Sequence, residues 1–385
     1  MDAGFAPEAE KHEAAGFDII GRSVGALIMS STPAQKFGLQ AVTGEYAGAE
    51  TVLNFGSAAE ELNALRHGCG VFDLGWRGKL VVSGEDRVRW LNGMVTNNTR
   101  DLRQDFGNYN FMLNSQGRIQ GDLLAFQRGE FFVLETEAGQ IAAIREFLER
   151  YIIMDEVEIG DISAGLTSIG VAGPRAVEVL ASAGLNPGNA RTGQVLDGSW
   201  NGMGFSLVKD PIETRNWYEL WLAPENVEAF WNALVAAGAA PVGAEALEWQ
   251  RVLLGLPRVG VDTGARVMPQ ETGQEYALHY TKGCYIGQEI VERIHARGQV
   301  HRGLAGLIVE GELPVAGSKV FSGEKEIGEI TSSAEIVVDG VQRKVALGYV
   351  KREAAAKSAS VETSLAESVT VGGSPAKITA LPFQF

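Results

Sequence analysis

The stretch Lys282–Glu289, KGCYIGQE, holds one of only two cysteines in a chain of 385 residues and runs directly into a predicted helix. That helix is expected over residues 288–297, because Ile290 and Ile294 lie four apart on one helical face. Gly298 follows as a natural C-terminal stop. The stretch therefore predicts a loop that ends at a helix N-terminus.

Cys284 is a candidate reactive thiol within this loop. It precedes the predicted helix N-terminus and lies two residues after Lys282, and both the helix dipole and the ammonium group favour a thiolate. The alternative is a small cysteine buried at a tight turn, since free cysteines are among the most buried residues in proteins. The residues alone leave both interpretations open.

The same stretch, continued by Arg293, Arg297-Gly298 and Arg302, resembles the signature of the YgfZ-type folate-binding proteins. These form a branch of the glycine-cleavage T-protein (aminomethyltransferase, GcvT-like) superfamily. Weaker similarity extends from about Phe55 to the C-terminus, and the first 50 residues take no part in it. The resemblance implies an α+β fold with three domains around a central folate cavity and a C-terminal β-barrel domain.

The expected domain boundaries combine this resemblance with local composition. Residues 1–50 are expected to form an N-terminal extension. Residues 51–165 and 243–300 are expected to form one discontinuous folate-binding α+β domain, because the later segment returns to the first domain in the family. Residues 166–242 are predicted to be a second α+β domain. Residues 301–385 are predicted to be the β-barrel, because strands separated by glycine turns dominate there.

Composition excludes several classes of function. A net charge of −15 argues against a nucleic-acid partner held by its phosphates. Two cysteines are too few for a disulfide framework or a four-cysteine metal site, and the five histidines lack zinc-ligand spacing, so no metal is expected. The longest apolar stretch, near Val24–Met29, is too short to span a membrane. A monomeric cytoplasmic protein without a membrane partner is the expectation.

Asp122 is the first candidate for chemistry. In the predicted strand 118–126 it shares one face with polar residues before it and apolar residues after it, a boundary that suits a carboxyl group to proton handling. The alternative is a carboxylate bonded to a nearby loop. In the resemblance, the catalytic or folate-facing aspartate of the family falls on Asp122. Gly121 stands where the aminomethyltransferases have another aspartate, which weighs against aminomethyl transfer but not against folate contact.

Glu219 is the second candidate, because it shares a strand face with Trp217 and Trp221. A carboxylate between two tryptophans is costly unless it is paired. A reduced pterin offers a ring N–H and an amino group side by side, and the tryptophans could wall its ring. The family's pterin-binding glutamate falls on Glu219. The alternative is a strand glutamate bonded to Arg215.

Arg251 is the third candidate, and with Asp262 it keeps a pattern of the same branch. The acidic residue usually found two positions after this arginine is Leu253 here. A structural salt bridge is an equal interpretation for Arg251.

The resemblance implies that tetrahydrofolate, or a one-carbon derivative of it, is the cofactor. The implied cofactor-binding residues are Asp122, Glu219, Arg251, Trp217, Lys282, Gly283, Tyr285, Gly287, Gln288 and Glu289, and the implied catalytic residues are Cys284 and Asp122. The implied function is support of iron–sulfur cluster assembly or repair through Cys284, with iron–sulfur proteins as clients. The alternative is a folate-dependent aminomethyltransferase or demethylase of the T-protein type, whose motif needs no cysteine.

Overall fold

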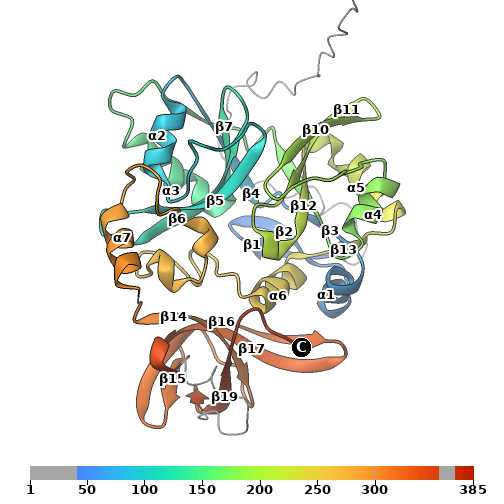
Figure 1. Ribbon diagram of the computed structural model, residues 1–385. Helices are drawn as coiled ribbons and strands as arrows, with labels where there is room; N and C mark the ends of the chain where they lie inside the picture. The colour runs from blue at the N-terminus through green and yellow to red at the C-terminus, as the bar shows by residue number, and fades with distance from the viewer. Residues whose placement is uncertain (1–40, 299, 355–368) are drawn as a thin grey trace, which may run out of the picture.

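The computed structural model describes residues 41–298, 300–354 and 369–385 and arranges their strands in three open sheets and one closed barrel (Figure 1). Residues 1–40 of the expected N-terminal extension lie outside the described residues. The predicted α+β class and the predicted C-terminal β-barrel are both confirmed.

The first large sheet holds five antiparallel strands and carries Asp122. Its strands, in pairing order, are β5 (Phe106–Leu113), β6 (Ile119–Gln127), β7 (Phe132–Glu137), β4 (Arg77–Ser83) and β8 (Glu158–Asp161). Helices α2 (Arg87–Met94) and α3 (Ala138–Glu149) cover one face, where Leu123 and Ala125 join their apolar core. Asp122 and Leu124 alternate onto the opposite face, because successive strand residues point to opposite sides.

The second large sheet holds six strands and carries Glu219. Its strands, in pairing order, are β10 (Val195–Trp200), β11 (Met203–Lys209), β12 (Trp217–Leu222), β9 (Thr167–Ala172), β3 (Gly70–Asp73) and β13 (Ala240–Val242). Helices α4 (Ala176–Ser182) and α5 (Val227–Ala236) cover the face onto which Leu220 and Leu222 point. Trp217 and Trp221 belong to two other cores, so the face that they share with Glu219 is turned away from these helices.

The C-terminal barrel lies below both sheets in Figure 1. Its strands, in pairing order, are β14 (Arg302–Val309), β17 (Val341–Lys351), β16 (Lys325–Val338), β15 (Lys319–Ser322), β18 (Val369–Val371) and β19 (Ser374–Thr379). Helices α1 (Ala58–His67) and α6 (Ala244–Leu254) separate it from the sheets. Leu62 of α1, Val252 of α6 and Ile336 of β16 share one apolar core, which joins the barrel to the rest of the protein.

Helix α7 (Gln288–Arg297) has the bounds that the sequence predicts. Glycines with positive φ bracket it, Gly287 at 82° and Gly298 at 66°. A Cβ atom on Gly287 would lie 2.6 Å from the carbonyl oxygen of Asn114, so no other residue fits there without a shift of the backbone. The short 3₁₀ helices are η2 (Glu213–Arg215), η3 (Pro224–Asn226), η4 (Pro269–Glu271) and η5 (Glu275–Ala277).

A hairpin of β1 (Val42–Tyr46) and β2 (Ala49–Asn54) precedes α1, where the sequence analysis predicts no strand. Its buried residues Ala49 and Val52 join the two apolar cores on opposite sides of the six-stranded sheet, the first of which is shared with the barrel. Among the described residues, no helix is both long and apolar enough to cross a membrane.

Candidate functional site

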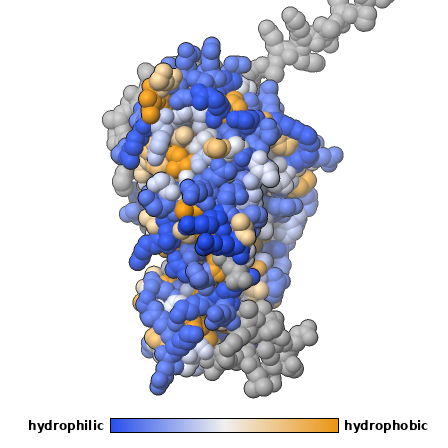
Figure 2. All heavy atoms as spheres, turned by 60° about the vertical axis from the view of Figure 1, so that its left-hand side comes forward, coloured by the Kyte–Doolittle hydropathy of each residue, from blue (hydrophilic) through white to orange (hydrophobic). Residues whose placement is uncertain are grey.

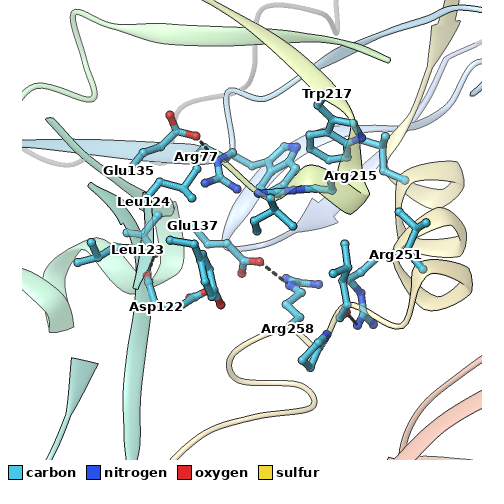
Figure 3. Close-up of a pocket in the computed structure, with 18 of the residues that line it drawn as sticks. Arg77, Asp122, Leu123, Leu124, Glu135, Glu137, Arg215, Trp217, Arg251 and Arg258 are labelled. Atoms are coloured by element: carbon cyan, nitrogen blue, oxygen red, sulfur yellow. Dashed lines mark hydrogen bonds and ion pairs between the residues drawn. The ribbon is translucent and has the colours of Figure 1, made fainter. Parts of the chain in front are cut away.

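The inner faces of the two large sheets, together with α6, enclose a cavity of about 770 Å³ when the part open to solvent is counted. Its walls include Asp122 from β6, Glu137 from β7 and Trp217 from β12. Arg251 from α6 and Arg258 from the loop after it complete the opposite side, and Figure 3 shows Arg258 reaching the carboxylate of Glu137 in the first sheet. Small-molecule sites are concave and lie preferentially between structural units, as this cavity does.

Asp122 is held by hydrogen bonds at both of its carboxylate oxygens. The hydroxyl of Tyr109 donates to Oδ2 at 2.8 Å, and Nε2 of Gln140 donates to Oδ1 at 2.9 Å. Gly121 points to the other side of the sheet, where an added Cβ would lie 3.3 Å from Ile144 and 3.4 Å from Oε1 of Gln140. The absence of a side chain at Gly121 thus leaves room for the glutamine that orients Asp122.

Glu219 is buried, with 1% of its surface exposed, and neither carboxylate oxygen has a hydrogen-bond partner among the described residues. Burial raises the pKa of this carboxyl, and the negative charge of Glu135 raises it further. The expected alternative partner, Arg215, forms its ion pair with Asp210 instead, at 2.9 Å, so that interpretation is wrong. Unpaired buried carboxylate oxygens are rare enough to require an explanation.

A cluster of buried charges between the two sheets contains residues that the sequence analysis did not single out. Nε of Arg77 and Nε1 of Trp221, the latter at 3.1 Å, donate to the carboxylate of Glu135. Lys79, fully buried, donates to Oγ of Ser168 at 2.6 Å and lies 3.7 Å from Glu135. Burial alone would raise the pKa of Glu135, but Lys79 and Arg77 outweigh it and lower that pKa.

Arg77 and Glu135 line the cavity, whereas Glu219 does not. Trp217, two residues before Glu219 on the same strand face, does line it. The sequence signal that could have revealed this cluster is the alternation of charged residues in β4 (RGKLVVS) and β7 (FVLETE), which places charges on one face of buried strands.

Arg251 forms the structural salt bridge that the sequence analysis weighs as an alternative. Its Nη1 donates to Oδ2 of Asp262 at 2.6 Å, and its Nε donates to Oε2 of Glu248 at 2.9 Å. Asp262 also accepts from the hydroxyls of Thr331 and Ser332 in β16. Arg251 thus both lines the cavity and links α6 to the barrel.

The side chains of KGCYIGQE do not line this cavity. The ammonium of Lys282 donates to the carbonyl oxygens of Val95 at 2.6 Å and Asn97 at 2.5 Å. Tyr285 packs in the core between the two sheets, and Cys284 is exposed. The expected cofactor contacts of Lys282, Gly283, Tyr285, Gly287, Gln288 and Glu289 stay predictions. Among the described residues, no three His, Cys, Asp or Glu side chains gather as metal ligands.

We expect the two cysteines to differ in reactivity. Cys69 is buried, and burial raises the pKa of its thiol to about 11, whereas Cys284 is exposed. Iodoacetamide at pH 8 should therefore modify Cys284 more than about tenfold faster than Cys69, because the thiolate is the nucleophile. A time course followed by peptide mass spectrometry measures both rates. Denatured protein, in which the two sites should react alike, is the control, and equal rates in the folded protein would contradict the assignment.

Comparisons with known proteins agree with this architecture. The family described as GCVT N-terminal domain matches residues 35–282. An aminomethyltransferase of Thermus thermophilus is 28% identical over 341 residues, covering 88% of this chain and 94% of that protein. The aminomethyltransferase of Streptomyces coelicolor is 28% identical over 362 residues, covering 90% and 94%. The crystal structure of the glycine cleavage system aminomethyltransferase T from Bartonella henselae superposes with a TM-score of 0.79 at 21% identity, covering 92% of this chain and 98% of that one.

Proposed function

The chain belongs to the GCVT N-terminal domain family, and from that premise we propose that it binds tetrahydrofolate in the cavity between its two large sheets and transfers a one-carbon unit, as an aminomethyltransferase does. The observation that carries the proposal is the unpaired state of Glu219. Both of its buried oxygens have no hydrogen-bond donor among the described residues, and Trp217, two residues away on the same strand face, lines the cavity.

The residues present fit a reduced pterin. The side chains of Trp217 and Glu219 leave the same face of β12 about 6.6 Å apart along the strand, so a ring beside Trp217 lies within reach of the carboxylate. Phe72 holds the Trp217 ring edge-on, with their centroids 4.8 Å apart. A neighbouring pair of N–H donors on the ligand would satisfy both oxygens of Glu219 at once.

The cavity also offers cations for the acidic end of a folate. Arg215 stacks on the Trp217 ring at 4.8 Å, and its Nε is buried without a hydrogen-bond partner among the described residues. Arg258 pairs with Glu137 at 2.8 Å inside the same cavity. Arginine suits the planar carboxylates of such a ligand.

Asp122 is the residue that we assign to proton handling. When bound, tetrahydrofolate supplies the nitrogen that carries the one-carbon unit. Tyr109 and Gln140 fix both oxygens of Asp122 at the cavity wall, so the carboxylate is oriented before a ligand enters. A positioned carboxylate can accept or return a proton at the reacting group. Leu124 and Trp217 form apolar parts of the same wall.

Asp122→Asn should lower turnover about 100-fold or more while leaving tetrahydrofolate affinity within about threefold, because the amide keeps the shape but no longer accepts a proton. The assay follows conversion of tetrahydrofolate to its one-carbon derivative with a panel of aminomethyl and N-methyl donors. Asp155→Asn is the matched control, since Asp155 pairs with Arg89 and does not line the cavity. Full turnover in Asp122→Asn would remove Asp122 from the mechanism.

A second candidate function is support of iron–sulfur enzymes through Cys284, and the exposed thiol favours it. The presence of Gly121 in place of the aspartate expected for aminomethyl transfer also favours this second function. Cys284→Ala separates the candidates. Unchanged one-carbon turnover supports the transferase, whereas loss of iron–sulfur enzyme activities in cells that carry only this variant supports the second function. The monomeric state and the cytoplasmic location stay predictions.

A further inference from the structure

A second pocket lies beside the KGCYIGQE loop and shares no lining residue with the cavity described above. It measures about 740 Å³ when the part open to solvent is counted, and its lining is mostly polar. Asn92 of α2, Asn98 and Arg100 form one side, and His279, Thr281 and Lys282 form the other. The face of the molecule shown in Figure 2, which is the left-hand side of Figure 1, is largely hydrophilic, with apolar residues in small scattered groups.

Two cations of this pocket have no carboxylate partner among the described residues. Lys282 is buried, with 8% of its surface exposed, and among the described residues its ammonium donates to two backbone carbonyl oxygens and to no side chain. Arg100 is exposed and forms no ion pair in the part of the chain that the structure describes. Burial first, and the charge of Arg100 second, together lower the pKa of Lys282 to about 7. Removing an ammonium from water without a counter-ion is unfavourable, and an anion in the pocket would offset that cost.

Hydrogen-bond donors converge on one point of the pocket. Oδ1 of Asn92 accepts from the backbone N–H groups of Thr99 and Arg100, which leaves its Nδ2 free to donate. That Nδ2 and Nη2 of Arg100 each lie 4.0 Å from the position that a Cβ atom on Gly283 would occupy. The one carboxylate in the lining, Asp101, already accepts from Asn98 at 2.7 Å. The space beside the Cα atom of Gly283 therefore faces the amide donor of Asn92 and the guanidinium group of Arg100.

We propose that this pocket is an oxyanion site that selects anionic partners for the neighbouring Cys284 thiol, and that its ligand class is small sulfur compounds bearing a carboxylate, such as an anionic disulfide. Gly283 lines the pocket and Cys284 is the next residue outside its lining, so their Cα atoms are about 3.8 Å apart. The reaction is thiol–disulfide exchange. The sulfur of Cys284 loses its proton to solvent and attacks one sulfur of the disulfide. A new S–S bond forms, the old one breaks, and the other half leaves as a thiolate.

The proposed preference of Cys284 for anionic reagents is opposite to the preference that the net charge of the whole protein predicts. A net charge of −15 repels anionic reagents at long range. A preference of Cys284 for an anion must therefore come from positive charge within a few ångströms, because charges beyond about 8 Å are screened at physiological salt. This prediction does not depend on the tetrahydrofolate proposal, since the two pockets share no lining residue.

The test compares three disulfides on the full-length protein, with Cys284 adducts quantified by mass spectrometry. These are 5,5′-dithiobis(2-nitrobenzoate), which is dianionic, bis(2-hydroxyethyl) disulfide, which is neutral, and cystamine, which is dicationic. Each rate is divided by the rate of the same reagent with a small uncharged thiol. The normalised rate should be highest for the dianion, and inorganic phosphate at constant ionic strength should slow the dianion only.

Arg100→Ala should reduce the preference for the dianion about fivefold and leave the neutral reagent unchanged, because one surface charge contributes about 1 kcal/mol at this range. Arg103→Ala, an exposed arginine of the same segment that does not line the pocket, should change neither rate. A normalised rate that is lower for the dianion than for the neutral reagent would overturn the proposal. A preference that survives Arg100→Ala intact would also overturn it.

Discussion

Replacing Glu219 with alanine should weaken tetrahydrofolate binding by about 2–4 kcal/mol, which is about 30- to 1,000-fold in dissociation constant. The physical reason is the loss of a charge-assisted pair of hydrogen bonds at oxygens that have no other donor among the described residues. Calorimetric titration with tetrahydrofolate measures the change directly.

Two further variants test whether the loss of affinity is specific to the carboxylate of Glu219. Glu213→Ala removes an exposed carboxylate from the 3₁₀ turn just before β12 and should leave the affinity unchanged. Glu219→Gln preserves the shape of the side chain but replaces one acceptor with a donor, so it should weaken binding nearly as much as alanine does. An unchanged dissociation constant in both Glu219 variants would show that the ligand does not contact this residue.

Replacing Arg251 with leucine should lower the free energy of unfolding by about 3–5 kcal/mol, because the change leaves the charge of Asp262 buried without its partner. Asp262 is 3% exposed, and besides Arg251 it accepts hydrogen bonds from the backbone N–H of Arg258 and from two hydroxyl groups of β16. Urea unfolding followed by circular dichroism measures the loss. The lost contacts join α6 to the barrel, so the barrel is the part whose docking should weaken.

The double variant Arg251→Leu with Asp262→Asn is the matched control. It removes both charges, so it should recover part of the lost stability. Arg251→Lys keeps the positive charge but loses the planar guanidinium that reaches Glu248 and Asp262 together. Its stability should therefore lie between that of Arg251→Leu and that of the unmodified protein. A single variant as stable as the unmodified protein would mean that the ion pair carries no net stabilisation.

The sequence predicted those elements whose structure depends on residues close together in the chain. Helix α7 has its predicted bounds because the spacing of its isoleucines and the glycine after it act within a few residues. The β1–β2 hairpin escaped prediction for the opposite reason. Its turn, Ala47-Gly48, adopts positive φ at both residues without the Asn-Gly or Asp-Gly pair that marks such turns. Its burial depends on the apolar cores on the two sides of the six-stranded sheet, which are distant in sequence.

The residues of the candidate site show the same contrast between local features, which the sequence predicts, and long-range contacts, which it does not. The alternation of β6 and β12 placed Asp122 and Trp217 on the faces that line the cavity, because a strand's period is a local property. The partners of those residues come from distant segments. Arg77 meets Glu135, 58 residues later in the chain, only after β4 pairs with β7, so this ion pair is not visible in the spacing. The ammonium of Lys282 likewise binds carbonyls of the segment after α2.

The most direct test of the central claim is a calorimetric titration of the unmodified protein with tetrahydrofolate under anaerobic conditions. The cavity between the two sheets predicts saturable binding of one molecule per chain, which Glu219→Ala weakens and Glu213→Ala leaves intact. No saturable heat at ligand concentrations up to about 1 mM, which corresponds to a binding free energy weaker than about −4 kcal/mol, would contradict it.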